Sequence, residues 1–223
     1  MIADGSCLVW WAGTADYRAE HESLLSGVEI DRSTRLHRDE DRVRQKLGAV
    51  LLRVAVGSAL GVPPTQVVVD RPCPRCTAPH GRPMLPGTGL HASITHSGDL
   101  VGLALTAVAP VGLDVERISD VDIEGLSRLV LHPDEKAADP DAFFTFWTRK
   151  EAVVKATGDG LGAPLSQVRV SEPGGPPELL GYPDRAAPPA AHLVDIRPAD
   201  GYRAALAVLS ATPVVVTERH GVL

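Results

Sequence analysis

Aromatic side chains and lysines are scarce in this 223-residue chain. Phe, Trp and Tyr together make up only 4% of the residues, so aliphatic side chains and alanine must form most of the core. Only four of the 22 basic residues are lysines, namely Lys46, Lys136, Lys150 and Lys155. Because arginine is the usual cation here, the lysines mark positions where a compact ammonium group matters, or else their distribution is chance.

Long apolar runs, a leader-like N-terminus and paired cysteines are also lacking. No run reaches the roughly 18 apolar residues of a spanning helix, and no charged segment followed by an apolar one opens the chain. The three cysteines, Cys7, Cys73 and Cys76, are an odd and small number, typical of reduced thiols in the cytosol. We therefore expect a cytoplasmic protein without a signal peptide and without a membrane partner.

A positive charge balance is absent as well, since the formal net charge is −6. This balance gives no global reason to expect DNA or RNA as a partner, although a local basic cluster can still bind a phosphate. The hydrophobic fraction of 44% is ordinary for a globular protein, and the length suits one large domain or two small ones.

Hydrophobic periodicity predicts helices and strands in both halves of the chain. Apolar residues at helical spacing over 38–60 predict a helix that stops at Gly61. A hairpin is expected over 91–106 with its turn at 97–99, and a strand over 111–118. Further helices are predicted over 121–131 and 143–157, further strands over 168–170, 192–196 and 202–209, and loops over 71–86 and 173–189. The fold class is therefore α+β, with a boundary near residues 109–110.

Two carboxylates stand on one predicted strand, in the segment Gly112-Leu113-Asp114-Val115-Glu116. Side chains alternate along a strand, so Asp114 and Glu116 point to the same side. Neighbouring carboxylates repel unless a cation lies between them, and oxygen ligands favour Mg²⁺ or Mn²⁺. The alternative is a solvent-facing edge of an amphipathic strand.

A second charged pair lies on the predicted helix over 143–157. Glu151 and Lys155 are four residues apart and share one face of that helix. Taken alone, such a pair is also typical of an exposed Glu–Lys contact that contributes little.

The two motifs together resemble the signature of the 4′-phosphopantetheinyl transferase family. That signature is a strand reading V-G-L-D-V-E followed by a helix reading W-T-R-K-E-A-V-V-K, as at residues 111–116 and 147–155. Residues 38–53 resemble the family's N-terminal helix, His80-Gly81-Arg82-Pro83 its H-G-K/R-P loop, and 92–98 its N-x-S-H-S-G segment. In that segment Ala92 replaces the usual Asn, and Thr95 replaces Ser but keeps a hydroxyl group.

The resemblance is closest to the larger, surfactin-synthetase-activating type, and it implies a fold and an activity. The fold would be a pseudo-twofold pair of subdomains over residues 1–109 and 110–223, with coenzyme A bound at their seam and a monomer as the working form. The activity would be transfer of 4′-phosphopantetheine from coenzyme A to a serine of an apo acyl or peptidyl carrier protein, releasing 3′,5′-ADP.

The resemblance also assigns roles to individual residues. Mg²⁺, or Mn²⁺, would be held by Asp114, Glu116 and Glu151. Glu151 would also be the general base, and Lys155 would hold the phosphates. The 3′-phosphate of coenzyme A would be bound by residues that the sequence places in the first half, namely Arg32, Arg44, Arg82, Thr95 and His96, with Pro83 in the same loop. Without the resemblance, His96 is better explained as a core or turn histidine.

Other interpretations remain open at this point. Paired carboxylates and a lysine also suit a Mg²⁺-dependent phosphohydrolase or nuclease, although the acidic chain does not favour a nuclease. A non-catalytic coenzyme A-binding module is a third possibility. Cys73 and Cys76 form a C-x-x-C pair, which either shapes the loop or contributes to a zinc site that would need further ligands such as His80 and His91. The apolar residues of 121–131 either pack in the core or dock a carrier protein.

Overall fold

The computed structural model of the chain describes residues 2–73, 76, 78–79, 81–119 and 122–221. These residues form two compact units, the first within 1–108 and 215–223 and the second within 109–214. Each unit contains helices packed on β-sheet, so the predicted α+β class is confirmed. In the part of the chain described here, no helix is long and apolar enough to cross a membrane.

The first unit contains a four-stranded sheet in the order β2-β3-β1-β9. Its strands are β1 (Ser6–Gly13), β2 (His91–Ser97), β3 (Leu100–Thr106) and β9 (Val215–His220). The predicted hairpin over 91–106 is confirmed, because β2 and β3 pair antiparallel with His91 opposite Thr106. β1 pairs antiparallel with β3, and β9 pairs parallel with β1.

The sequence predicted no strand after residue 209, and the structure adds β9 there. The predicted second half ran to residue 223, whereas β9 lies beside β1 in the first unit. Two indole N–H groups hold it there: Trp11 donates to Glu218 Oε2 at 2.9 Å, and Trp10 donates to the Gly221 carbonyl at 2.6 Å. β9 is mostly exposed and polar, so its sequence carries no apolar alternation that could have predicted it.

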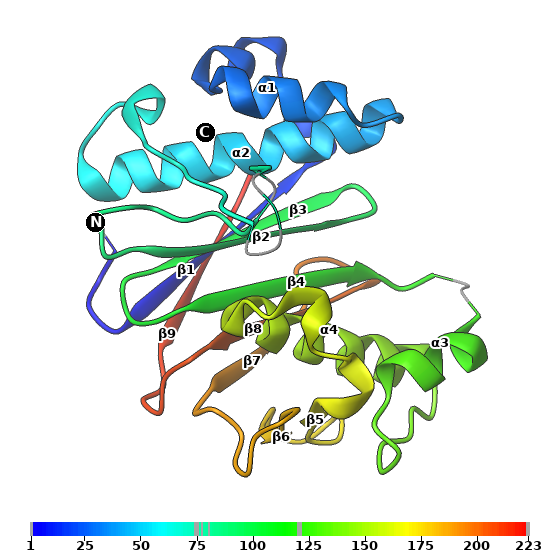
Figure 1. Cartoon of the computed structure of the whole chain (residues 1–223). Coiled ribbons are helices and arrows are strands. Elements are labelled where there is room, and N and C mark those ends of the chain that lie inside the picture. Colours follow the sequence, from blue (N-terminus) through cyan, green and yellow to red (C-terminus); the bar gives the residue numbers. More distant parts are fainter. Residues whose placement is uncertain (1, 74–75, 77, 80, 120–121, 222–223) are drawn as a thin grey trace. The chain divides into compact units, whose positions relative to one another are not determined.

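A long helix, α2 (Asp39–Leu60), covers this sheet (Figure 1). It confirms the predicted helix and ends at Gly61, whose φ of 68° is left-handed. Its buried face, including Leu47 and Leu51, packs with Leu103 and Leu105 of β3. A shorter helix, α1 (Gly27–Thr34), lies against α2. Short 3₁₀ helices occupy Thr14–Asp16, Ala19–Leu24 and Pro64–Gln66.

The second unit also contains a long helix packed on a β-sheet. Its antiparallel sheet has the order β4-β8-β7, formed by β4 (Val111–Arg117), β8 (Tyr202–Val208) and β7 (His192–Ile196). All three strands were predicted. A separate pair consists of β5 (Arg169–Val170) and β6 (Leu179–Gly181), and β6 lies inside the segment predicted as loop.

Helix α4 (Pro140–Thr157) packs on β4 and β8. It begins three residues before the predicted start, because Asp139 caps it by accepting a hydrogen bond from Ala142 N and Pro140 occupies its first position. It ends at Gly158 as predicted. Helix α3 (Ile123–Val130) lies within the predicted 121–131, of which Val121 is outside the described residues. Two 3₁₀ turns, η4 (Gly160–Gly162) and η5 (Leu165–Gln167), follow α4.

Candidate active site

A glycine lets the backbone of α4 lie directly on the backbone of β4. A Cβ atom at Gly112 would fall 1.9 Å from the Ala152 carbonyl oxygen and 2.6 Å from Ala156 N. Any side chain at this position would force the helix away from the strand. The glycine therefore brings the second half of α4 within hydrogen-bonding distance of β4.

Asp114 and Lys155 form the centre of the site that results. The Lys155 ammonium donates to Asp114 Oδ1 at 2.6 Å and to the Leu113 carbonyl at 3.1 Å. The Asp114 side chain is only 5% exposed, whereas that of Lys155 is 31% exposed. A buried carboxylate thus faces a cation that still reaches solvent, which is an arrangement able to bind an incoming phosphate.

Glu151 lies one helical turn before Lys155 and belongs to the same cluster. Burial raises the pKa of Glu151, the negative charge of Asp114 raises it further, and Lys155 opposes the rise. The structure thereby brings together three predicted residues, Asp114, Glu151 and Lys155. The fourth, Glu116, follows Asp114 by two positions on β4 and has Arg203 as its pairing partner on β8.

The donor chemistry of this cluster fits Mg²⁺. Carboxylate oxygens are the ligands that Mg²⁺ prefers, and the mutual repulsion of Asp114 and Glu151 is what a cation would relieve. Among the described residues, no three His, Cys, Asp or Glu side chains converge in a metal-ligand arrangement. The cation beside Asp114 in this structure is the ammonium of Lys155.

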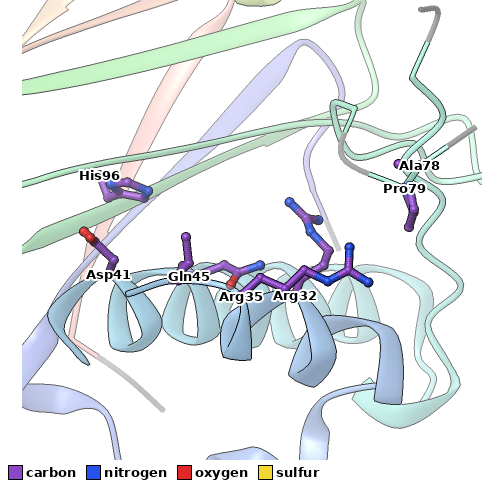
Figure 2. Close-up of a pocket in the computed structure, with 8 residues that line it drawn as sticks. Arg32, Arg35, Asp41, Gln45, Ala78, Pro79 and His96 are labelled. Carbon is purple, nitrogen blue, oxygen red and sulfur yellow. The ribbon is translucent and has the colours of Figure 1, made fainter. Parts of the chain in front are cut away.

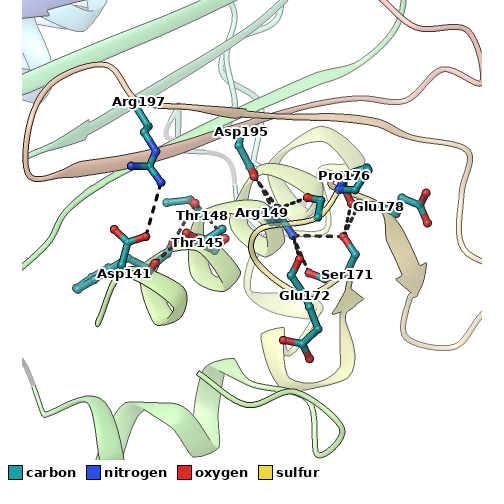
Figure 3. A network of polar contacts seen from close by, with 12 residues as sticks. Asp141, Thr145, Thr148, Arg149, Ser171, Glu172, Pro176, Glu178, Asp195 and Arg197 are labelled. Atoms are coloured by element: carbon teal, nitrogen blue, oxygen red, sulfur yellow. Dashed lines mark hydrogen bonds and ion pairs between the residues drawn. The ribbon is translucent and has the colours of Figure 1, made fainter. Parts of the chain in front are cut away.

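Two buried cations that precede Glu151 anchor helix α4, and sequence reasoning gave neither of them this role. Arg149 is fully buried and contacts both carboxylate oxygens of Asp195, at 2.8 and 2.6 Å (Figure 3). It also donates to the Ser171 and Glu172 carbonyls. Lys150 is fully buried too and pairs with Glu135 at 2.5 Å. A helical wheel places Arg149 and Lys150 on other sides of α4 than Glu151, but only the fold shows which groups they bind.

A basic pocket of about 430 Å³ lies in the first unit (Figure 2). Two predicted residues, Arg32 of α1 and His96 of β2, line it. The pocket also contains residues that the sequence did not indicate, namely Arg35, Leu36, Asp41, Gln45, Ala78 and Pro79. Gln45 Oε1 is buried there and accepts no hydrogen bond from the residues that the structure describes.

Positive charge is concentrated beside this pocket. Burial lowers the pKa of Arg32, and the neighbouring Arg35 lowers it further while Glu29 opposes. Burial and the charge of Arg32 also lower the pKa of Arg71, to about 10. Glu29 fixes α1 on α2 through a buried ion pair with Arg53 at 2.7 Å. Clustered guanidinium groups held in this way favour an anionic ligand.

The other predicted phosphate ligands lie outside the pocket lining. Arg44 pairs with Asp41 at 2.5 Å and donates to the Gly98 carbonyl at 2.7 Å, so it braces the turn between β2 and β3. Thr95 and Pro83 are buried. Arg82 is exposed. Burial lowers the pKa of His91, and the nearby charge of Arg82 lowers it further.

The C-x-x-C loop runs beside the basic pocket. The backbones of Cys73 and Cys76 pair antiparallel across the turn. Ala78 and Pro79, which follow Cys76, line the pocket. Pro74, Arg75 and His80 lie outside the described residues, so the zinc interpretation stays untested.

A buried carboxylate beside a lysine, and an arginine-lined pocket, are typical of enzymes that act on phosphate esters. Comparison with known proteins identifies the family of this chain. The model of the 4′-phosphopantetheinyl transferase superfamily matches residues 110–207. The chain is 33% identical to 4′-phosphopantetheinyl transferase HetI of Nostoc sp. over 83% of this chain and 79% of that protein. It is 27% identical to 4′-phosphopantetheinyl transferase Sfp of Bacillus subtilis, over 86% and 84% of the two chains.

Among solved structures, a holo-acyl-carrier-protein synthase of Thermotoga maritima matches with a TM-score of 0.38 and 29% identity, over 45% of this chain and 62% of that one. The chain belongs to the 4′-phosphopantetheinyl transferase superfamily. The family predicted from the two motifs is therefore confirmed.

Proposed function

We propose that this enzyme transfers 4′-phosphopantetheine from coenzyme A to a serine of an apo acyl or peptidyl carrier protein. The observation that carries the proposal is the contact of Lys155 with Asp114 beside a Glu151 whose pKa is raised. This cluster stands in the segment that matches the family model.

In the proposed reaction the carrier serine attacks the β-phosphorus of coenzyme A. The bond from that phosphorus to the bridging oxygen breaks, and 3′,5′-ADP leaves with the oxygen. Glu151 accepts the serine proton, for which its raised pKa makes it a stronger base than an ordinary carboxylate. Lys155 holds the phosphate oxygens on which charge accumulates.

Asp114, Glu116 and Glu151 would hold Mg²⁺, or Mn²⁺ in its place. The ion would supply charge neutralisation at the pyrophosphate. Their oxygen donors and the crowding of negative charge around Asp114 support this assignment.

The basic pocket of the first unit is proposed to bind the 3′-phosphate of coenzyme A. Arg32 and His96 were expected to do so, and Arg35 is added because it lines the same pocket. Arg82 and Thr95 stay candidates for this phosphate on the strength of the resemblance. Arg44 and Pro83 are proposed to shape the surrounding loops, since Arg44 holds the turn at Gly98.

Helix α3 is proposed to dock the carrier protein. Val130 is buried, but Leu129 beside it is 67% exposed, which core packing does not explain. Asp122 caps the helix by accepting a hydrogen bond from Gly125 N at 2.9 Å. An exposed leucine on a capped, rigid helix suits contact with an apolar helix of a partner.

The test is incubation of the enzyme with coenzyme A, Mg²⁺ and a panel of apo carrier proteins, followed by intact-mass spectrometry. A carrier that gains one phosphopantetheinyl group supports the proposal. Hydrolysis of coenzyme A without carrier modification would favour a phosphohydrolase, and binding without either reaction would favour a coenzyme A-binding module. A monomeric, cytoplasmic enzyme that binds no nucleic acid stays a prediction of the sequence.

A further inference from the structure

The residue before Glu151 holds helix α4 to several segments at once. The Lys150 ammonium donates to Glu135 at 2.5 Å, to the Val130 carbonyl at 2.7 Å and to the Leu165 carbonyl at 3.1 Å. An ammonium group has three protons, so each of them has an acceptor. Lys150 is fully buried and cannot touch coenzyme A or a carrier protein.

Glu135 extends these contacts to two more segments. Its Oε2 accepts a hydrogen bond from His132 N at 2.8 Å, and its Oε1 accepts one from Val170 N at 2.9 Å. The Lys150–Glu135 pair therefore ties α4 to the end of α3, to the turn after α3, to η5 and to β5. Such a buried pair often stabilises a fold no more than apolar residues would, so its value lies in the geometry that it specifies.

The pair supplies the directional contact between α3 and α4. Val130 also packs with Phe143 and Phe144 in an apolar cluster, but apolar contacts do not fix direction. The bond from Lys150 to the Val130 carbonyl does fix it, because hydrogen bonds require alignment. Leu129, on the proposed docking surface, precedes Val130, and Glu151, the proposed base, follows Lys150.

We propose that the Lys150–Glu135 pair is a positioning element that sets the carrier-docking helix α3 against Glu151. The inference rests on the proposed function, and it deepens that function by linking recognition of the carrier to the reacting residues. Without the pair, the carrier would bind less well and present its serine less accurately. Coenzyme A binding would be unaffected, since Asp114 and Lys155 are held by the separate contact of α4 with β4 at Gly112.

The test uses the double variant Lys150→Met/Glu135→Gln, which removes both charges and leaves no unpaired buried ion. The control is Arg149→Met/Asp195→Asn, which removes an ion pair that is also anchored on α4. Among the described residues, the hydrogen bonds of Arg149 go to Asp195 and to the 171–175 segment, and not to α3. Thermal unfolding, KM for coenzyme A and KM for a carrier that the wild type modifies are measured for all three proteins.

The positioning role predicts that KM for the carrier rises about tenfold in the Lys150/Glu135 variant, the change that about 1.4 kcal/mol produces. KM for coenzyme A stays at the wild-type value, and the control keeps both KM values even if its Tm falls. A carrier KM within about twofold of wild type, or an equal rise in both KM values, overturns the inference.

If the double variant does not fold, Glu135→Gln alone gives the decision. It keeps the shape of the side chain but weakens the pair, so a smaller rise confined to the carrier KM is expected, and an unchanged carrier KM overturns the inference. Failure of the wild type to modify any carrier would instead contradict the proposed function, so the two failures are distinguishable.

Discussion

Both units place a long helix on a β-sheet, yet they present opposite charges. In the first unit, α1 and β2 bring Arg32 and His96 to a pocket, and burial together with neighbouring positive charge lowers the pKa of Arg32 and of Arg71. In the second unit, β4 and α4 bring carboxylates together, and burial together with the negative charge of Asp114 raises the pKa of Glu151. The first unit is therefore suited to bind an anionic group that does not react, and the second to stabilise charge that changes during a reaction.

The largest expected effect is the loss of Asp114. Asp114→Asn keeps the shape of the side chain but removes the charge that faces Lys155 and that would hold Mg²⁺. We expect no measurable carrier modification, with a circular dichroism spectrum like that of the wild type. Near-normal turnover at low Mg²⁺ would remove Asp114 from the site.

Glu151→Gln tests the proposed base. Loss of a general base lowers kcat by about 10²–10⁴. KM for coenzyme A should change little, because Lys155 and Asp114 remain. In the wild type, kcat/KM should fall as the pH drops through the raised pKa of Glu151, and this acidic limb should disappear in the variant. Steady-state kinetics as a function of pH measure both effects, and an acidic limb that persists in Glu151→Gln would assign it to another group.

The two helix-on-sheet contacts differ in how they tolerate an added methyl group. A Cβ at Gly112 would meet the backbone of α4 at 1.9 Å, whereas one at Gly48 of α2 would meet the Ile94 Cγ2 methyl at 2.8 Å. A side chain can move more easily than a helix backbone, and alanine favours the helix at position 48. We expect Gly112→Ala to lower stability by about 3 kcal/mol, and Gly48→Ala by about 1 kcal/mol or less. Thermal unfolding compares them, and equal losses would contradict the backbone contact.

A smaller effect is expected on the docking surface. Leu129→Asp adds charge at an exposed position of α3 and should raise KM for the carrier by about threefold to tenfold, without changing KM for coenzyme A. Glu124→Asp, a conservative change at another exposed position of α3, is the matched control. An equal change in both KM values for Leu129→Asp would indicate a disturbed fold instead.

Most of the fold could be predicted where a pattern is local. Helix α2 has clear helical periodicity and ends at Gly61, the 91–106 hairpin alternates around a turn that contains Gly98, and both were found. β1 was missed because it is buried almost throughout and shows no alternation, and β9 because its pairing with β1 joins distant parts of the sequence.

The site residues likewise divide into those that a local sequence motif predicts and those that only the fold brings together. Asp114, Glu151 and Lys155 lie in two contiguous motifs, so the sequence predicted them together. Arg35 was not predicted, since it joins Arg32 and His96 only when α1, β2 and the 78–79 loop pack around one pocket. The sequence likewise shows that Lys150 lies on another side of the helix than Glu151. Its three hydrogen-bond acceptors could not be predicted, because they come from other parts of the chain.

The central claim is that the first unit binds the 3′-phosphate of coenzyme A and the second unit holds the reacting residues. It is tested most directly with dephospho-coenzyme A, which lacks only the 3′-phosphate. The measurement is the ratio of kcat/KM for coenzyme A to that for dephospho-coenzyme A, in the wild type, Arg32→Ala, Arg82→Ala and Glu151→Gln. The wild type should prefer coenzyme A by about tenfold or more, as expected for charge-assisted phosphate contacts. That preference should largely vanish in Arg32→Ala, and also in Arg82→Ala if Arg82 shares the contact with the 3′-phosphate. Glu151→Gln should retain the preference, although its kcat is much lower. Full preference in both arginine variants, or its loss in Glu151→Gln, would contradict the account.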